Sequence, residues 1–283
     1  MLDPAKMENS LTQHILEDVD VIPESTYIWH WKTEHRFSFH KHNKGQLTYV
    51  EGGAAFLYTR DKTYFLPARH YMWVPAGVEH YFVHRYPANY IRNIYFFSDP
   101  TDANDPFYSK TGIYPVSNLL LEMILHTANW DGHILPTDKR FTFLKAMKEM
   151  LPEISASPLP INLPTTDHPR LQPVLRYIQE NLAENLTLES VGHHFNLSER
   201  TLTRLFRNTM DISFFQYLKL ARMIRALGYL LETRKSVNEI AWDTGYNSVS
   251  AFSNTFYKLI GKRPSEFQHK DHKEPDLPPD IIQ

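Results

Sequence analysis

Two histidines lie two residues apart in the stretch FHKHNKGQ, which runs from Phe39 to Gln46. In a strand, side chains two residues apart point to the same face, so the imidazoles of His40 and His42 would lie together. Gln46 adds a polar amide four residues further on. Neutral imidazole ligates transition metals and also hydrogen-bonds small molecules. The stretch therefore indicates either a metal site, with catalysis as one use, or the wall of a ligand pocket.

The residues around this stretch predict an antiparallel β-domain. Short runs rich in Tyr, Phe, Val and Trp, broken by Gly, Pro and Asn, fill residues 27–97. Such closely spaced runs are typical of strands in a barrel or jelly roll. We expect strands at QLTYV, AAFLYT, TYFLP, HYMWVP, HYFVH and IRNIYFF. Helical periodicity then marks one amphipathic helix at Val116, Leu120, Met123 and Ile124 and another at Phe143, Ala146, Met147 and Met150.

Composition divides the chain into two domains and limits its location. Five prolines in the nineteen residues LPEISASPLPINLPTTDHP exclude a helix there, so we interpret 156–168 as a linker between domains 1–155 and 169–270. We expect residues 271–283 to be a disordered tail. The absence of cysteine, of an apolar run of about 18 residues and of a signal sequence leads us to expect a cytoplasmic protein without membrane contact.

The charge is divided in the same way as the domains. Residues 169–270 carry a net charge of +5, and the rest of the chain carries −7. A basic end on an acidic body is typical of a nucleic-acid-binding segment, although a solvated helical face gives the same signal.

The basic end contains an internal repeat. VGHHFN (191–196) corresponds to IAWDTG (240–245), and Ser198, Leu202 and Phe206 recur fifty residues later as Ser248, Phe252 and Phe256. Asn196 and Gly245 tolerate the left-handed backbone that ends a helix, and each following serine suits the N-cap of the next. SVNE (236–239) has the pattern of a capping box. These signals predict two helix-turn-helix units.

The second helix of each unit leaves polar residues outside its apolar stripe. Because Leu202, Leu205 and Phe206 form the first stripe, arginines fall on the outer face, where they can pair with guanine or hold phosphate. The predicted DNA-contacting residues are Arg200, Thr203, Arg204 and Arg207 in the first unit and Val249, Ser250, Ser253, Asn254 and Lys258 in the second.

A long helix is predicted between the units, over residues 213–234. About 20 helical residues span about 30 Å, close to the pitch of about 34 Å of DNA. One rod would thus hold two reading helices in successive major grooves. A helical bundle that has a basic face but does not bind DNA is disfavoured by the doubled motif and its caps.

Residues 186–267 resemble the DNA-binding domain of AraC/XylS-type transcription regulators. The resemblance rests on the long helix with Ala226, Leu230 and Leu231, on the core from Ile240 to Ser248, and on the closing Phe256, Gly261, Pro264 and Phe267. It implies seven helices, with base contacts at Arg200, Thr203 and Arg204 and at Val249, Ser250, Ser253 and Asn254. Asn254 stands where arginine is frequent, which implies weaker binding by the second unit or contact with an adenine edge.

One position in the long helix is unusual. Gly228 lies in its interior, where glycine costs about 1 kcal/mol relative to alanine. The glycine indicates either close packing of another segment against this helix or a helix that bends more easily at this point.

The first domain resembles the cupin sensor domain of many such regulators. HKHNKGQLTYVEGG looks like the first cupin motif, and PAGVEH (75–80) looks like the second. Metal-binding cupins have two histidines, a glutamate and a later histidine where this chain has His40, His42, Gln46 and His80. Three imidazoles suit zinc, iron, nickel or copper, but the neutral Gln46 replaces a charged ligand. We therefore favour contact with a small-molecule ligand and keep a divalent metal at His40, His42 and His80 as the alternative.

The expected fold is α+β in two domains, a cupin-like antiparallel barrel with helices and an all-α domain with two helix-turn-helix units. The resemblance implies a sequence-specific transcription regulator rather than an enzyme. Its partners would be double-stranded promoter DNA, a small-molecule effector, a second copy joined through helices 116–151, and RNA polymerase if it activates. The alternative is a metal-dependent cupin enzyme fused to a DNA-binding domain, which would lack a charged fourth ligand and a clear acid/base pair.

Overall fold

The computed structural model describes residues 16–31, 38–51, 54–67, 69–84, 90–155, 158–159 and 161–267. The tail predicted at 271–283 lies outside the described residues. Within them, no helix is both long enough and apolar enough to cross a membrane.

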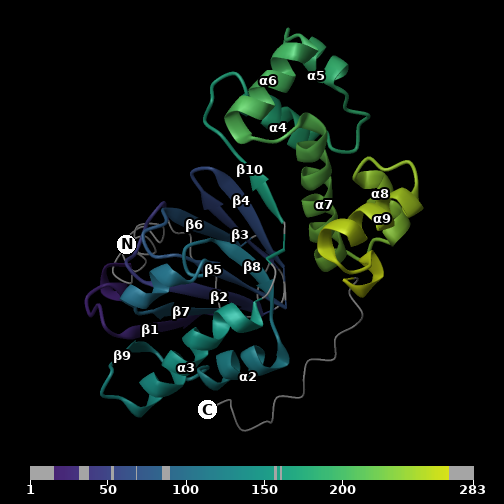
Figure 1. Cartoon of the computed structure of the whole chain (residues 1–283). Coiled ribbons are helices and arrows are strands. Elements are labelled where there is room, and N and C mark those ends of the chain that lie inside the picture. Colours follow the sequence, from purple (N-terminus) through teal and green to yellow (C-terminus); the bar gives the residue numbers. More distant parts are fainter. Residues whose placement is uncertain are drawn as a thin grey trace, which may run out of the picture.

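The first domain is built from two antiparallel sheets (Figure 1). The larger has the order β8 (Gly112–Pro115), β5 (His70–Val74), β2 (Gly45–Glu51), β7 (Tyr90–Phe96), β1 (Thr26–Trp31) and β9 (Gly132–Ile134). The smaller has the order β10 (Asn162–Pro164), β4 (Lys62–Pro67), β3 (Ala54–Thr59) and β6 (His80–His84). All six strands predicted from the sequence are present. The ladders end at β8 and β9 in one sheet and at β10 and β6 in the other, so the described strands do not close into a barrel.

Two helices cover one face of the larger sheet. α2 (Asn118–His126) buries Leu120 and Ile124, as its periodicity predicted. α3 (Lys139–Ile154) buries a face rotated from the predicted one: it turns Leu144, Met147, Lys148 and Leu151 inward and leaves Ala146 exposed. The apolar faces of both helices share one core with Leu47, Tyr49 and Trp73 of the sheet.

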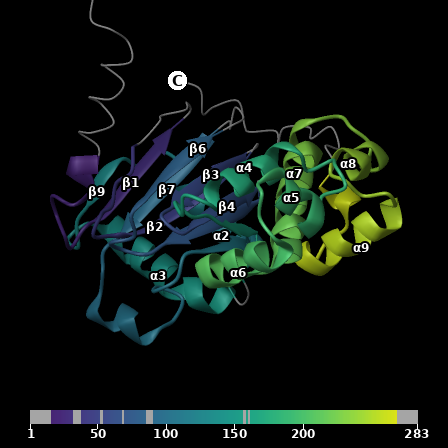
Figure 2. The same cartoon turned by 90° about the horizontal axis from the view of Figure 1, so that it is seen from above.

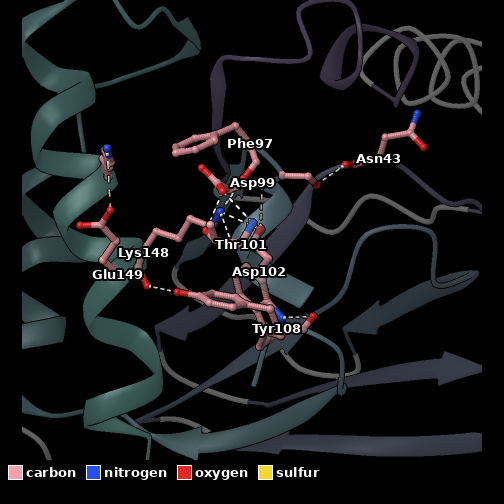
Figure 3. Close-up of polar contacts among 11 residues, drawn as sticks. Asn43, Phe97, Asp99, Thr101, Asp102, Tyr108, Lys148 and Glu149 are labelled. Carbon is pink, nitrogen blue, oxygen red and sulfur yellow. Dashed lines mark hydrogen bonds and ion pairs between the residues drawn. The ribbon is translucent and has the colours of Figure 1, made fainter. Parts of the chain in front are cut away.

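A buried lysine fastens α3 to the segment after β7 (Figure 3). The Lys148 ammonium lies 2.8 Å from the Asp102 carboxylate and donates to the Phe97 carbonyl oxygen at 2.9 Å. The Tyr108 hydroxyl donates to the Lys148 carbonyl at 2.8 Å. Because the charge is paired and hydrogen-bonded, the lysine is held at 3 % exposure instead of pointing to solvent.

The segment predicted as a linker is partly a strand. Contrary to the expectation from its prolines, the start of the proline-rich stretch is helical, because α3 continues through Pro152 to Ile154. Further on, Asn162–Pro164 pairs with β4 as an edge strand. Edge strands tolerate proline because one side of the strand needs no ladder donors. The amides of Phe65 and Thr165 donate to the carbonyls of Ile161 and Asp61. The connection is thus attached to the first domain and does not form a free tether.

The second domain is organised around one helix. Six α-helices are described, namely α4 (Gln172–Glu180), α5 (Leu188–His194), α6 (Glu199–Met210), α7 (Phe214–Glu232), α8 (Val237–Asp243) and α9 (Val249–Ile260), followed by the 3₁₀ turn η2 (Pro264–Glu266). The start of α7 packs on α6, and its later turns pack on α8 and α9. α7 also contacts β4 and β10, so it lies beside the smaller sheet, with α8 and α9 on its other side (Figures 1 and 2).

The helix boundaries follow the predicted signals. As N-caps, the side chains of Ser198 and Ser248 accept hydrogen bonds from the amides of Thr201 and Ala251. Ser236 forms a capping box with Glu239. Asn196 and Gly245 have φ of 52° and 78°, which ends the first helix of each unit in left-handed backbone.

Arg222 of α7 joins the two units. Its guanidinium donates to the carbonyls of Leu182 and Glu184, which precede the first unit, at 3.1 and 2.8 Å. The same group lies 5.7 Å from the Tyr246 ring of the second unit. Gly245 fits against it only because it has no side chain: a Cβ would overlap the Leu182 oxygen and the guanidinium.

We predict that Gly245→Ala lowers the thermal midpoint more than Gly261→Ala. Both glycines have φ near 77°, where a Cβ costs about 1–2 kcal/mol. Only Gly245 also meets neighbouring atoms, because nothing lies within 4 Å of a Cβ at 261. Thermal unfolding of the full chain measures both variants, and equal losses would contradict the role given to Arg222.

Candidate DNA interface and histidine cluster

α6 presents the four predicted residues of the first unit on one exposed face. Leu202 and Phe206 are fully buried, which turns the opposite side of the helix outward. Arg200, Thr203, Arg204 and Arg207 are all exposed, and their spacing places them side by side along the helix. The structure therefore brings together the arginine face that the sequence predicted.

α9 presents a less charged face. Ser250, Asn254 and Lys258 are exposed at four-residue spacing, whereas Ser253 and Val249 are half-buried. Val249 packs against the core, so its side chain is only partly available to DNA. The sequence also suggested Ala251 for the buried stripe, but Ala251 is exposed and the stripe consists of Phe252, Phe256 and Ile260.

Arg263 is a residue of this face that sequence reasoning missed. Its Nη1 donates to Asn254 Oδ1 at 3.3 Å, and its guanidinium lies 4.6 Å from the Tyr257 ring. A cation therefore stands beside Asn254, the position where the sequence lacks an arginine. The only sequence signal was a basic residue just after the helix-ending Gly261.

The four predicted residues of the first domain come together in the sheet interior. One ring nitrogen from each of His40, His42 and His80 lies within 4.8 Å of the others. His42, Gln46 and His80 are at most 2 % exposed. The histidine stretch is not a regular strand: His40 makes an isolated bridge to His80, and His42 lies in the loop before β2. The rings meet through this bridge and not through the alternation that the sequence suggested.

The hydrogen bonds define which ring nitrogens face the cluster. The Nδ1 atoms of His40, His42 and His80 lie 2.9, 2.6 and 2.8 Å from the carbonyl oxygens of Ser38, Lys44 and Val78. Because a carbonyl oxygen only accepts, Nδ1 carries the proton in each ring. In a neutral ring this leaves Nε2 as a lone-pair donor.

Gln46 completes the cluster with an oxygen. Its amide nitrogen donates to Thr48 Oγ1 and Asn93 Oδ1, at 2.9 and 3.1 Å. Its Oε1 lies 3.0 Å from His42 Nε2 and 3.1 Å from His80 Nε2. Lone pairs therefore face one another without a proton between them. A cation relieves this conflict, and so does a reversal of both the Gln46 and the Asn93 amides.

Burial keeps these imidazoles neutral. It lowers the pKa of His40 to about 4, and it also lowers the pKa of His42 and His80, the latter with added repulsion from the other two rings. Neutral imidazole is the form that ligates a metal. Three such nitrogens and an amide oxygen are a donor set that fits a divalent transition metal.

Lys44 is a buried residue beside the cluster, and its own carbonyl oxygen is the partner of His42 Nδ1. Its role gave no signal in the sequence. It is 1 % exposed, and its ammonium donates to the carbonyls of Ile22, Pro23 and Ser25 at 2.7–2.9 Å. Burial lowers its pKa to about 8. This lysine fixes the loop that carries the His42 partner carbonyl.

A sheet domain with a buried polar cluster, joined to two helix-turn-helix units on one rod, is the architecture of a DNA-binding regulator. Family models agree with it in both domains: an AraC-like ligand-binding domain matches residues 24–98, and a helix-turn-helix domain matches residues 191–270. The chain belongs to the AraC-type transcription regulators. The matched models describe a ligand-binding domain and a helix-turn-helix domain, as expected of a regulator, so the alternative of a cupin enzyme is set aside.

Two curated relatives match both domains. The chain is 27% identical over 228 residues to the HTH-type transcriptional regulator NimR of Escherichia coli, covering 81% of each chain. It is also 27% identical over 288 residues to the regulator YfiF of Bacillus subtilis, covering 92% of this chain and 88% of the relative.

Two solved domains are similar to part of this chain. The C-terminal domain of AraT from Geobacillus stearothermophilus is 31% identical, covers 38% of this chain and 93% of its own, and gives a TM-score of 0.36. The DNA-binding domain of AdpA, solved with a target DNA, is 28% identical to this chain. The match covers 35% of this chain and 88% of the AdpA domain, with a TM-score of 0.34.

We predict that Arg204→Ala weakens specific DNA binding by about 1–3 kcal/mol and relaxes the preference at one base position. Arg140→Ala, which removes an exposed arginine from the first domain, is the control for net charge. Binding to a panel of single-base variants measures both effects. A uniform loss on every sequence would show that Arg204 contacts phosphate instead.

Proposed function

We propose that this chain regulates promoters by reading two successive major grooves with α6 and α9, in response to a signal received by the first domain. The proposal rests on one observation: both helix-turn-helix units pack on α7, and the basic face of α6 is exposed. α7 has 19 residues and thus spans about 30 Å, close to one DNA turn. A transcription regulator acts on the chromosome, and we accordingly place it in the cytoplasm.

We propose that α2 and α3 form the surface of a homodimer. Leu119 on α2 is 53 % exposed, and the partly buried Met123 and Phe143 line an open hollow beside it. A pair of chains would read paired sites, as two-fold symmetry requires. RNA polymerase is a further partner if the chain activates.

The histidine cluster is the proposed input site, and we propose that a divalent metal is part of that input. The support is the protonation pattern: each Nδ1 donates to a backbone carbonyl, which is the usual outer arrangement of metal-bound histidine. The cation would be held by His40, His42 and His80, with Gln46 as a neutral oxygen donor. An effector with oxygen or nitrogen atoms would then bind at an open position of the metal.

A footprint of the full chain on DNA selected from a random pool tests the regulatory function. We expect two protected segments per half-site, about one turn apart, and an affinity that falls steeply with salt. Compounds that bind the first domain should change the affinity or the spacing of the footprints. Equal binding to all sequences would contradict specific reading, and unchanged footprints with bound compounds would contradict the coupling.

Metal analysis on the same sample tests the cluster. After chelation and titration with Zn²⁺, we expect one ion per chain, lost in His42→Ala and retained in His126→Gln, which changes an exposed histidine outside the cluster. Gln46→Glu should tighten binding at least tenfold, about 1.4 kcal/mol, because it supplies the missing charge. The metal proposal is contradicted if the wild type binds no zinc and Gln46→Glu only destabilises the fold. That result would support the alternative in which the side-chain amides of Gln46 and Asn93 are both reversed and no cation is needed.

A further inference from the structure

A cavity of about 250 Å³ lies in the seam between the two domains. Its first wall is the outer face of the smaller sheet, with Phe56 and Tyr58 on β3 and Thr63 and Phe65 on β4. These residues are cross-strand partners in the ladder, Phe56 with Phe65 and Tyr58 with Thr63. They alternate with Leu57 and other residues that point into the sheet domain. The cavity is therefore separated from the histidine cluster by the thickness of the sheet.

The second wall is one face of α7. Ala221, Ile224, Arg225, Gly228 and Tyr229 line the cavity at the spacing of a single helical face. Leu163 of β10 and Gln179 and Leu182 near the end of α4 close the remaining sides. Both domains thus contribute walls to one partly open cavity.

The position of Gly228 accounts for its presence in the middle of a long helix. Glycine there costs about 1 kcal/mol relative to alanine. At this cavity wall the missing side chain leaves room that a larger residue would occupy. Ala221, two turns earlier on the same face, is also small.

The lining defines the chemistry of an occupant. Four aromatic rings, those of Phe56, Tyr58, Phe65 and Tyr229, favour a flat apolar body. An apolar cavity of about 150 Å³ holds benzene, so this larger space admits a fused or substituted aromatic ring. The Arg225 side chain is exposed at one side, and its Nη2 donates to the Gln179 carbonyl at 3.1 Å. A guanidinium held in this way can pair with a carboxylate.

We propose that the seam is a second ligand site, which binds a small aromatic carboxylate with its ring between the β3–β4 face and α7 and its carboxylate on Arg225. Because the two walls come from different domains, such a ligand binds the arrangement in which α7 lies on the sheet and stabilises that arrangement. The ligand would therefore act directly on the helix that carries both reading units. This site goes beyond the proposed input at the histidines and does not depend on it.

Calorimetric titration of the full chain with 2-naphthoate and with uncharged 2-naphthylmethanol tests the proposal. Gly228→Leu fills the cavity from α7, and Thr63→Phe fills it from the sheet. Lys219→Leu is the matched control because it adds the same side chain to an exposed position of α7 outside the cavity. Circular dichroism and thermal unfolding verify that each variant folds.

We expect one naphthoate per chain, with a dissociation constant below about 1 mM. Either filling variant should weaken binding at least tenfold, whereas Lys219→Leu should bind as the wild type does. Arg225→Gln should weaken naphthoate but not naphthylmethanol. The proposal is overturned if the wild type binds neither probe at about 5 mM, or if both folded filling variants bind like the wild type. If Arg225→Gln weakened the binding of both probes equally, the proposed pairing of Arg225 with the ligand carboxylate would be refuted.

Discussion

Helix α7 is the constraint on which the other parts of the molecule depend, because three sets of contacts occupy different faces of it. Phe214 and Tyr217 belong to the core of the first helix-turn-helix unit, and Leu227 belongs to the core of the second. A third face lies on β4 and β10. A rigid helix cannot turn toward one neighbour without moving against the others. The positions of the two reading helices are therefore linked to each other and to the sheet domain.

The histidine cluster and the α7 contact surface are connected by a short continuous path. His80 lies on β6, opposite Thr59 of β3. The next residue, Tyr81, stacks on Tyr58 at 4.7 Å with nearly parallel rings, and Tyr58 forms a wall of the seam. A change in the position of β6 would thus reach the face of the sheet against which α7 packs. Such contiguity makes coupling physically reasonable, and measured coupling energies are what establish it.

Local signals predicted much of this fold, whereas long-range pairings had no signal to detect. Serine caps and the left-handed Asn196 and Gly245 defined both units, because caps and helix ends depend on neighbouring residues. β10 was missed because Pro164 and the prolines before it argue against a strand, and its pairing with β4 is visible only in three dimensions. The roles of Lys44, Lys148 and Arg222 were also missed. Each is a charged side chain that is held by distant carbonyls or carboxylates, which no spacing in the sequence reveals.

The central claim is that α7 acts as a rigid spacer between two DNA-reading units. It is tested most directly by inserting five base pairs between the two segments that one chain protects and measuring the affinity of the full chain. Five base pairs rotate one groove by about half a turn relative to the other. The account predicts at least a tenfold loss, because α7 cannot lengthen or twist to follow. An unchanged affinity would contradict it and would mean that the two units read DNA independently.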